Sequence, residues 1–294
     1  MSTNPTQEEL VVGVIGGSGL YEIEGLQDVE EVALSTPFGE PSDAFVVGTL
    51  DGVRMVFLPR HGRGHRLLPS ELNFRANIWG LKRLGVTRIL SVSAVGSLRE
   101  DVSPGEFVVI DQFIDRTRHR ADTFFGDGAV AHVMFADPVC EHVRKALLKA
   151  SGEAGVRAHD GGTYVNMEGP QFSTRAESHL YRSWKADVIG MTNLQEAKLA
   201  REAEMCYATV AMVTDFDCWH EGHDDVTVEA ILEVMRTNVA HAKSVVAAAV
   251  PHLEAQRSCA CRNALQFAIM TDPAVIPAAA RDRLGLLIDR YVGS

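Results

Sequence analysis

Short apolar runs that end in glycine or polar turns alternate along the chain with stretches of helical periodicity. Residues 11–15 form the first run, which breaks into the glycine-rich sequence GGSG as a buried strand does when it enters a loop. Two further strand-like runs, 44–50 and 53–58, are joined by Asp51-Gly52, a strong signal for a two-residue hairpin. This antiparallel pair excludes a design of purely alternating parallel strands and helices.

Helices are predicted where apolar residues recur every three or four positions. The first follows Pro69-Ser70, which offers a cap, and stops at Gly85. The other predicted helices span residues 138–150, 174–184, 193–203 and 278–291, together with a long helix that Thr227 caps and that finishes before Pro251. Further strands are predicted at residues 86–95, 107–110, 188–191 and 206–213.

Strands and helices interleave without a linker, a repeat or a low-complexity tract. We therefore predict an α/β fold consisting of a single domain with a mixed central β-sheet flanked by helices. Residues 11–250 are expected to form this domain. Residues 251–294 are expected to be a C-terminal extension with a terminal helix, packed on the same domain or on a neighbouring subunit. Residues 118–132 form a long loop, and loops of that length are usually functional or face a partner.

Composition and charge narrow the class of protein. The chain of 294 residues is 46% hydrophobic and 23% charged, which excludes disorder. It contains no run of roughly 18 apolar residues and no basic, apolar leader, so we expect a cytoplasmic protein without a membrane partner. The net charge of −11 provides no basic field for nucleic acid, so a small anion has to be bound by a local site. Five cysteines, of which only Cys259 and Cys261 are closely spaced, do not form a secreted disulfide framework.

Three segments near strand ends carry groups suited to an anion. The amides of the GGSG turn and the Ser18 hydroxyl can form an anion-binding concavity, although Glu22 stands where a dinucleotide fingerprint needs its last glycine. The Arg60 fork can hold two phosphate oxygens and His61 can supply another donor. Small residues at 91–98 leave room for a ligand at a strand's carboxyl end.

Simpler interpretations of these segments stay open. The glycine turn is also compatible with a tight turn that binds nothing, and residues 91–98 with ordinary turn chemistry. His61 and His65 have the spacing of a metal pair, but no acidic or thiol third ligand accompanies them. The basic loop around them is also compatible with a solvated surface segment.

Two later segments carry groups suited to a sugar hydroxyl, a flat base and proton donation. A helix that starts at Ser173 or Thr174 explains the polar residues of one segment, but it does not explain Glu168 and Phe172 before them. The Glu168 carboxylate suits a sugar hydroxyl, and the Phe172 ring suits a flat base. Asp215 and Asp217 follow an apolar run and, being two residues apart, point to one space. Neighbouring carboxylates in a partly dry cleft resist ionising together, so one keeps a proton and can act as an acid. An acidic turn or a weak divalent-ion site is the alternative.

In order and spacing these segments resemble the trimeric purine nucleoside phosphorylases, and specifically the branch that acts on S-methyl-5′-thioadenosine. The resemblance implies attack of inorganic phosphate on the anomeric carbon to give adenine and 5-methylthioribose 1-phosphate, in methionine and purine salvage. It implies a homotrimer or a dimer of trimers, and phosphate as a co-substrate with no cofactor. Its most specific motifs are VIGGSGL at 14–20, TPFGEPSD at 36–43, RHGRGH at 60–65, SLRE at 97–100, IDQFIDRT at 110–117, EGPQFSTRAES at 168–178 and TDFDCW at 214–219.

The resemblance also implies roles for individual residues. It places Asp215 and Asp217 as the catalytic pair at the purine, with Asp215 lending a proton to the imidazole-side ring nitrogen and Asp217 accepting from an exocyclic amino group. A preference for 6-aminopurines follows, because a 6-oxopurine would leave buried groups unpaired. The phosphate contacts fall on Ser18, Arg60, His61, Ser93, Ala94 and Thr192. Met191 falls at the ribose, Phe172 near the base, Ser173 and Val228 at positions of nucleoside selectivity, and His132 at the methylthio pocket of a neighbouring subunit.

Other functions stay open at this point. A broader purine nucleoside phosphorylase would also accept adenosine or methylthioinosine. A nucleoside-binding sensor would keep the pocket without turnover, although it would not need both the phosphate cluster and Asp215. A dinucleotide-binding module is the weakest alternative. In some heat-stable relatives the pair matching Cys259 and Cys261 is a disulfide, whereas two reduced thiols are expected here.

Overall fold

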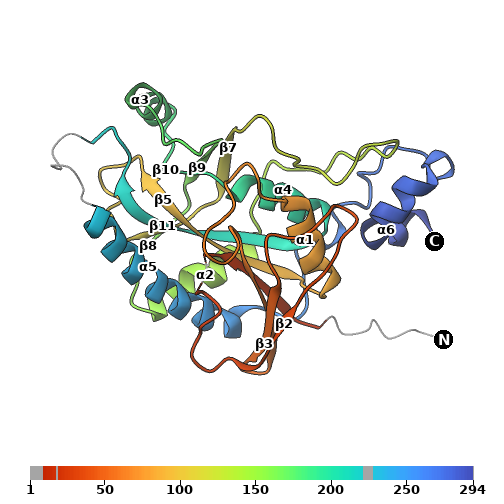
Figure 1. The fold of residues 1–294 in the computed structure, drawn as a ribbon, viewed down its shortest axis with the longest axis horizontal. Helices are drawn as coiled ribbons and strands as arrows, with labels where there is room; N and C mark the ends of the chain where they lie inside the picture. Colours follow the sequence, from red (N-terminus) through yellow and green to blue (C-terminus); the bar gives the residue numbers. More distant parts are fainter. Residues whose placement is uncertain (1–8, 18, 221–227, 294) are drawn as a thin grey trace.

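One mixed β-sheet runs through the part of the chain that the computed structural model describes, which is residues 9–17, 19–220 and 228–293, with the backbone alone at 228–232. Strands neighbour one another in the order β2-β3-β4-β1-β5-β10-β9-β7, and β11 pairs with β5 and β6. Figure 1 shows β5 and β11 crossing the centre of the molecule. The strands are β1 (Val11–Gly16), β2 (Gln27–Val32), β3 (Phe45–Leu50), β4 (Val53–Pro59), β5 (Arg88–Ser97), β6 (Phe107–Val109), β7 (Gln112–Arg116), β8 (Ala158–Asp160), β9 (Thr163–Met167), β10 (Val188–Gly190) and β11 (Cys206–Phe216).

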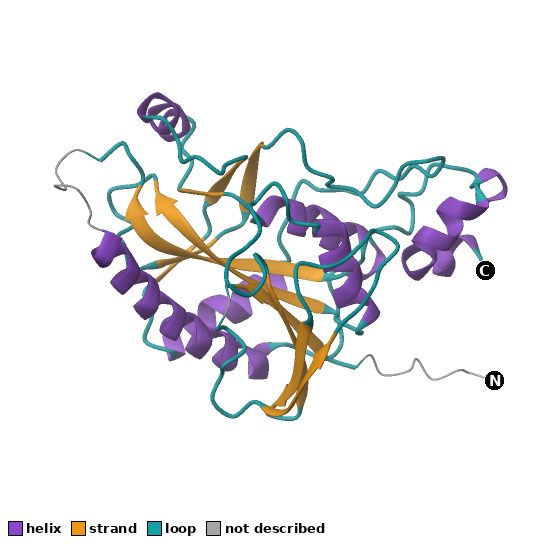
Figure 2. Ribbon diagram, in the orientation of Figure 1, coloured by secondary structure: helices purple, strands orange, loops and turns teal. Residues whose placement is uncertain are grey.

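Helices cover both faces of the sheet (Figure 2). They are α1 (Phe74–Arg83), α2 (Glu141–Glu153), α3 (Arg175–Ser183), α4 (Asn193–Glu202), α5 (Val228–Ala249) and α6 (Ala278–Val292). Alternation along β1 illustrates the two layers, because Val12 and Val14 belong to the apolar core with α2 and α5, whereas Val11 and Ile15 belong to the core with α1 and α4. A Cβ at Gly13 would lie 2.8 Å from Val86, so glycine lets the α1 layer approach the strand closely. The predicted single α/β domain with a mixed sheet between helices is confirmed.

Most predicted elements appear close to their expected positions. The Asp51-Gly52 hairpin joins β3 and β4 with Leu50 opposite Val53, and both turn residues have positive φ. Thr174 caps α3 in a capping box with Glu177.

The start of the first helix differs from the prediction. Helix α1 begins at Phe74 with Asn73 as its cap, rather than after Ser70. The Asn73 side chain accepts from the Ala76 amide and donates to the Phe38 carbonyl at 2.7 Å, a contact distant in sequence that Ser70 does not make. Strands β2, β7, β8 and β9 were not predicted, because β2 is an exposed acidic edge strand, β8 has three residues, and β7 and β9 lie inside motifs chosen for their chemistry.

The long loop after β7 lies against the C-terminal extension. Its His132 amide donates to the Ala268 carbonyl at 2.8 Å, and Arg283 of α6 pairs with Asp127 at 2.8 Å. In Figure 1 the loop and α6 lie together at one end of the molecule. We call this part, residues 118–137 and 264–293, the arm. Within the described residues, no helix has the length and apolarity needed to span a bilayer.

Candidate functional site

Four parallel strands bring the predicted anion and purine segments to one edge of the sheet. Strands β4, β1, β5 and β11 are neighbours in that order and run in one direction, so their carboxyl ends lie together. The glycine turn after β1 and Arg60 after β4 are tied directly, because the Arg60 amide donates to the Gly16 carbonyl at 2.8 Å. This is the edge at which open α/β sheets bind ligands.

Strand β5 sets the spacing between the two halves of the site. The Arg60 guanidinium donates to the Val92 carbonyl at 2.9 Å, whereas Asp215 pairs with Gly96 in the β5–β11 register. Four residues of extended strand span roughly 13 Å. The cationic group and the carboxylate pair therefore lie beside the same strand, separated by about that distance along it.

The Arg60 guanidinium is buried and largely engaged within the protein. Its Nε donates to Glu196 Oε1 at 2.5 Å, and its Nη2 donates to Glu196 Oε2 at 3.1 Å and to Ser91 Oγ at 2.7 Å. Since Nη1 also donates to Val92, these contacts leave one Nη1 hydrogen of the five that arginine offers. The expectation of a fork open to two phosphate oxygens is therefore not met, because Glu196 occupies that fork. Despite burial, the paired Glu196 carboxylate raises the pKa of Arg60, which keeps its charge in place.

His61 lies beside Arg60 with one ring nitrogen engaged. Its Nδ1 is 2.8 Å from the Leu67 carbonyl, and since a carbonyl only accepts, Nδ1 carries the proton. Burial lowers the pKa of His61 to about 4, so the ring is neutral near pH 7. Its Nε2 is then an acceptor, where the sequence predicted a donor. The ring stacks on His65 with centroids 4.3 Å apart, an arrangement of rings face to face rather than two ligands aimed at one ion.

Small hydroxyl groups complete the anion side. Ser93 and Thr192 are buried, and Ala94, on β5, is partly exposed. Thr192 is the N-cap of α4, yet its side chain makes no capping hydrogen bond, so the hydroxyl is available to a ligand at a helix start that favours negative charge. Ser18 lies outside the described residues.

Asp215 and Asp217 converge on Gly96 of β5. A Cβ at position 96 would lie 3.2 Å from Asp215 Oδ1 and 3.3 Å from the Cβ of Asp217, so glycine makes room for both side chains. A bulge between Val213 and Asp215 shifts the strand register at this point. The Thr214 hydroxyl, which belongs to that bulge, donates to Asp215 Oδ2 at 2.7 Å.

The two carboxyl groups differ in their surroundings. Burial raises the pKa of Asp215 against the Thr214 hydrogen bond, and the charge of Asp217 raises it further. Burial also raises the pKa of Asp217, whose amide is fixed by the Ser97 carbonyl at 3.1 Å. Among the described residues, Asp217 Oδ2 is buried without a hydrogen-bond partner. Burial thus shifts both carboxyl groups toward their protonated forms, and Asp217 Oδ2 is left for a partner from outside the described chain.

The base and ribose candidates come from the segment before α3 and from β10. Cys218 Sγ donates to the Ser173 carbonyl at 3.3 Å, so the loop that carries Asp217 touches the start of α3. Phe172, the neighbour of Ser173, is 82% exposed in the single chain. A Cβ at Gly169 would lie 2.6 Å from Met191 Sδ, so Met191 packs directly on this segment.

The structure does not bring His132 to this edge, and it does not describe the side chain of Val228. His132 is exposed on the arm, with its amide bonded to the extension. The side chain of Val228, the first residue of α5, lies outside the described residues, as does the predicted cap Thr227.

Sequence reasoning missed Arg120. Its buried guanidinium donates to Glu168 Oε1 at 2.9 Å and to the carbonyls of Glu168 and Met191. The Arg118 amide also donates to Glu168, and these hydrogen bonds outweigh burial and lower the pKa of that carboxyl. Arg120 therefore fixes the segment that carries the ribose candidate Met191. Position in a long loop was its one sequence signal.

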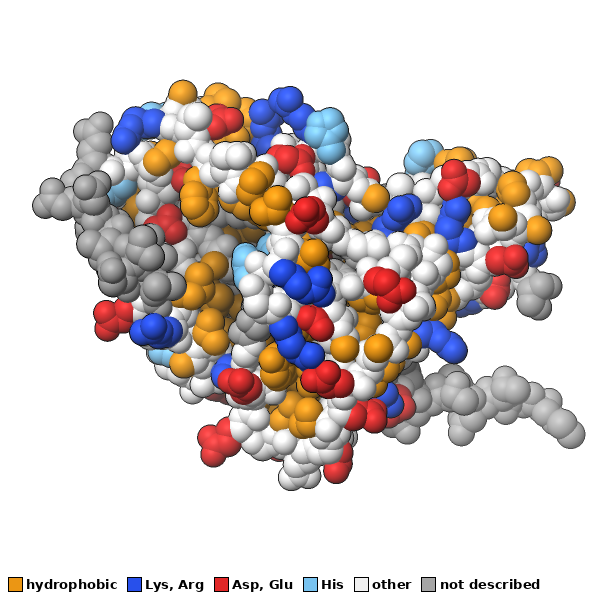
Figure 3. Space-filling view, in the orientation of Figure 1, with side chains coloured by type: hydrophobic (Ala, Val, Ile, Leu, Met, Phe, Trp, Pro, Cys, Tyr) orange, Lys and Arg blue, Asp and Glu red, His pale blue; other side chains and the backbone are white. Residues whose placement is uncertain are grey.

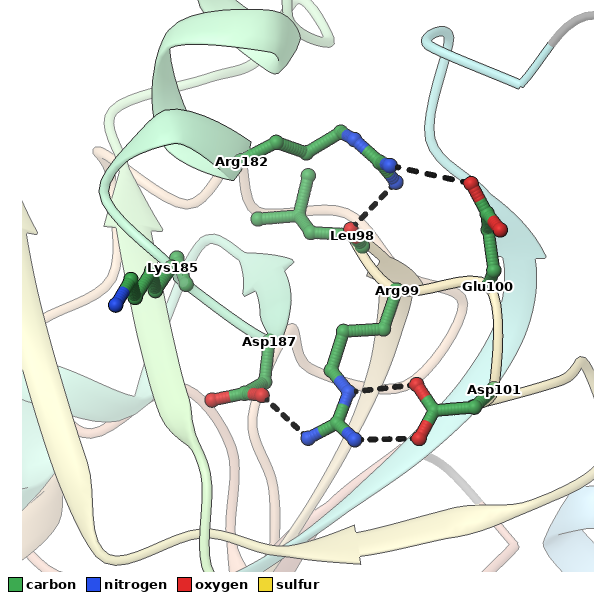
Figure 4. A pocket seen from close by; sticks show the side chains of 8 residues that line it. Leu98, Arg99, Glu100, Asp101, Arg182, Lys185 and Asp187 are labelled. Atoms are coloured by element: carbon green, nitrogen blue, oxygen red, sulfur yellow. Dashed lines mark hydrogen bonds and ion pairs between the residues drawn. The ribbon is translucent and has the colours of Figure 1, made fainter.

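A recess of about 380 Å³ near α3 is a different feature (Figure 4). Arg99 in its wall donates to both Asp101 and Asp187 at 2.8 Å or less. Arg182, also in its wall, lies 3.4 Å above the Trp219 ring. Arg182 thus links the wall of the recess to the loop after β11.

Surface charge and apolar exposure are distributed unevenly. Figure 3 shows basic and acidic side chains interspersed over the face in view, with no extended basic field. Orange side chains gather on the lobe formed by the arm (Figure 3). The arm's strongly exposed apolar residues are Met134, Phe267, Met270 and Val275. An apolar surface of this kind is typical of a contact with another chain.

Comparison with known proteins covers most of the chain. Residues 11–251 match the model of the phosphorylase superfamily. A relative from Geobacter sulfurreducens named S-methyl-5′-thioadenosine phosphorylase is 64% identical over 97% of this chain and 100% of its own length, and one of the same name from Koribacter versatilis is 62% identical over 96% and 97%.

Solved structures agree with this similarity. The crystal structure of a methylthioadenosine phosphorylase from an Antarctic soil metagenomic library has a TM-score of 0.92 at 49% identity, covering 96% of this chain and 99% of its own. A point mutant of the adenosine/methylthioadenosine phosphorylase of Schistosoma mansoni, solved with methylthioadenosine, has a TM-score of 0.75 at 40% identity, covering 83% and 91%.

Proposed function

The chain belongs to the phosphorylase superfamily, and we propose that it cleaves S-methyl-5′-thioadenosine with inorganic phosphate, giving adenine and 5-methylthioribose 1-phosphate. The observation that carries the proposal is the arrangement along β5. An anion side built on Arg60, His61 and Thr192 and the carboxylate pair of Asp215 and Asp217 lie at the same sheet edge, on either side of the carboxyl-terminal half of β5. The relatives that are similar to this chain over nearly its whole length are named for this activity.

The anion side presents phosphate as a nucleophile. The remaining Nη1 hydrogen of Arg60 and the hydroxyls of Ser93 and Thr192 are donors to phosphate oxygens. The neutral His61 accepts through Nε2 from the protonated oxygen of hydrogen phosphate, which leaves an unprotonated oxygen to attack the anomeric carbon. We expect no resident cofactor, because phosphate itself is the second substrate.

The carboxylate side promotes departure of the base. As the new C–O bond forms, the glycosidic C–N bond breaks and its electron pair moves into the purine, which leaves an oxocarbenium-like sugar at the transition state. Asp215, whose pKa is raised by burial, is the proposed donor of a proton to the imidazole-side ring nitrogen. Asp217 Oδ2 accepts from the exocyclic amino group, which selects 6-aminopurines. Met191, Phe172, Ser173 and Val228 are proposed to line the ribose and base.

The arm points to an assembled enzyme. We propose a homotrimer or a dimer of trimers, in which the apolar surface of the arm is covered by a neighbour and His132 contributes to that neighbour's methylthio pocket. Exposure of Phe267 at 89% and Met134 at 84% in the single chain supports a buried role in an assembly. The reaction belongs to methionine and purine salvage, and we place it in the cytoplasm.

An absorbance assay on methylthioadenosine with and without phosphate tests the function. Base release that requires phosphate supports it, whereas binding without phosphorolysis would identify a sensor. Turnover of adenosine as fast as its methylthio analogue would favour the broader nucleoside phosphorylase, an alternative that the dual name of the Schistosoma mansoni relative brings forward. Equal turnover of inosine would contradict the role of the carboxylate pair.

A further inference from the structure

Four of the five cysteines meet in one place far from the candidate site. Their ligand atoms all lie within 4.8 Å of one another, and Cys206 Sγ is 3.3 Å from Cys259 Sγ. The four, all free thiols, are Cys140, Cys206, Cys259 and Cys261. The fifth, Cys218, lies beside Ser173 instead.

The spacing fits a single tetrahedral ion. Four sulfurs at about 2.3 Å from a zinc ion stand roughly 3.8 Å apart. A cluster in which all four sulfurs lie within 4.8 Å of one another is compatible with that separation. Packing alone explains one buried cysteine, since free cysteine behaves as a small apolar residue. It does not explain four thiols within 4.8 Å of one another, because S–H groups are weak donors and sulfur is a weak acceptor.

The backbone holds the ligands from separate elements. Cys140 is the N-cap of α2, and its amide donates to the Tyr207 carbonyl at 2.8 Å, next to Cys206 at the start of β11. Cys206 donates its own amide to the Thr87 carbonyl at 3.0 Å. Cys259 and Cys261 arrive from the C-terminal extension, as the N-cap and an interior residue of a short 3-10 helix. The thiols thus face one another on a fixed frame.

The surrounding charge matches a thiolate site. A recess of about 440 Å³ opens onto Cys206 and Cys259, and its wall carries more basic than acidic side chains although the whole chain has a net charge of −11. Four thiolates around a divalent ion carry a net charge of −2, which nearby cations stabilise. The charged residues in the wall are Arg88, Lys145, Lys149, Arg257 and Glu254, with His142 and His252 beside them.

We propose that Cys140, Cys206, Cys259 and Cys261 bind one Zn²⁺ ion in a structural site that ties the C-terminal extension to the sheet. Four soft thiolates without an open position are typical of structural zinc. Binding releases the thiol protons and adds metal affinity to the stability of the fold. The site is separate from phosphorolysis, so failure of one proposal leaves the other intact.

The position of the zinc site indicates that it holds the arm on the sheet. The extension that follows Cys261 continues into the arm, where the Leu265 amide and the Tyr291 hydroxyl both donate to Glu204 Oε1, at 3.0 and 2.5 Å. Glu204 lies two residues before Cys206. The metal therefore fixes the base of the arm, and its loss loosens the extension and the loop that carries His132.

Metal analysis of the full-length protein, purified without chelators or metal-affinity resin, tests the site. We expect about one zinc per chain. The double variant Cys259→Ser/Cys261→Ser is expected to retain below about a tenth of that, with a lower Tm, because two ligands cannot hold the ion. The matched control Cys218→Ser keeps its zinc, since that thiol lies outside the cluster.

Cobalt substitution keeps the test independent of variants that fold poorly. Wild-type protein exchanged into Co²⁺ is expected to show the visible bands and thiolate charge-transfer absorption of a tetrahedral thiolate complex. Disulfides between the four cysteines, found by mass spectrometry of unreduced protein, would overturn the proposal. So would four free thiols without metal, or iron in place of zinc.

Discussion

The pairing of Arg60 with Glu196 predicts a large and specific effect of Glu196→Gln. The carboxylate accepts four hydrogen bonds, two from Arg60, one from the Ser91 hydroxyl at 2.9 Å and one from the Tyr207 hydroxyl at 3.1 Å. Side chains on both sides of the ion pair are nearly inaccessible, at 4% and 2% exposure. Removing one partner of such a pair leaves an uncompensated buried charge.

The expected magnitude follows from that burial. Breaking a buried ion pair by removing one partner costs about 3–5 kcal/mol of unfolding free energy. For a domain of this size that corresponds to a decrease in Tm on the order of 10 °C. The measurement is thermal unfolding in phosphate-free buffer.

The matched control is Glu202→Gln on the same helix. Glu202 accepts from the Thr123 hydroxyl at 2.7 Å and the Phe124 amide at 2.8 Å, and burial raises its pKa to about 7. A neutral side chain therefore replaces it at small cost near pH 7, about 1 kcal/mol. Equal decreases in Tm for the two variants would refute the argument that Glu196 compensates Arg60.

Phosphate supplies a second readout. In Glu196→Gln the Arg60 fork loses its carboxylate, so an added anion compensates the charge more strongly than in the wild type. An anion at 100 times its Kd stabilises the folded state by about 2.7 kcal/mol. We expect phosphate to raise the Tm of Glu196→Gln more than that of the wild type at equal concentration. Equal shifts would place phosphate away from Arg60.

Three further predictions concern protons and positioning. Asp215→Asn is expected to lower kcat/KM for methylthioadenosine by about 10²–10⁴-fold, because the proton donor is lost, and to shift the preference toward 6-oxopurine nucleosides. Steady-state assays that show the wild-type kcat/KM and the wild-type ratio of kcat/KM between 6-aminopurine and 6-oxopurine nucleosides would contradict this. The pKa of Glu202 is raised to about 7 in the folded state, so between about pH 4.5 and 7 the folded state holds a proton on Glu202 that the unfolded state has lost. The contribution of Glu202 to the free energy of unfolding therefore declines as pH rises through this range. His61, with its pKa lowered to about 4, contributes in the opposite direction between about 4 and 6.5. Wild type and Glu202→Gln share that contribution, so the test is how the difference in their Tm changes with pH. A difference that stays constant from about pH 4.5 to 7 would contradict the raised pKa of Glu202. Arg120→Gln is expected to raise KM for the nucleoside several-fold, because the Met191 carbonyl loses its hydrogen bond from Arg120. In the same steady-state assays, KM for phosphate is expected to stay near the wild-type value. Equal changes in both KM values would assign Arg120 a general structural role.

Sequence patterns predicted the structure correctly where a turn, a cap or a helix depends on a short segment of the chain. The Asp51-Gly52 turn, the capping box at Thr174 and Glu177 and the terminal helix depend on neighbours within a few residues, and each is present. The cap of α1 was misplaced because Asn73 also bonds to Phe38, which no local pattern reveals.

The candidate site divides in the same way. Motifs near strand ends identified the groups that lie at one sheet edge, because parallel strands bring their carboxyl ends together. The partners of those groups were invisible in the sequence. Glu196 lies 136 residues from Arg60, and Arg120 reaches Glu168 and Met191 from a loop without regular structure.

The sequence by itself determined the elements, the α/β class and the residue types able to bind phosphate and protonate a base, since these depend on periodicity, turn chemistry and side-chain identity. Only the tertiary structure decided which charges are paired, which nitrogen of His61 carries the proton and which cysteines meet. These outcomes depend on burial and on contacts between segments that are distant along the chain. A side chain's free energy of ionisation or metal binding is set by its neighbours in space, and the order of residues alone does not specify those neighbours.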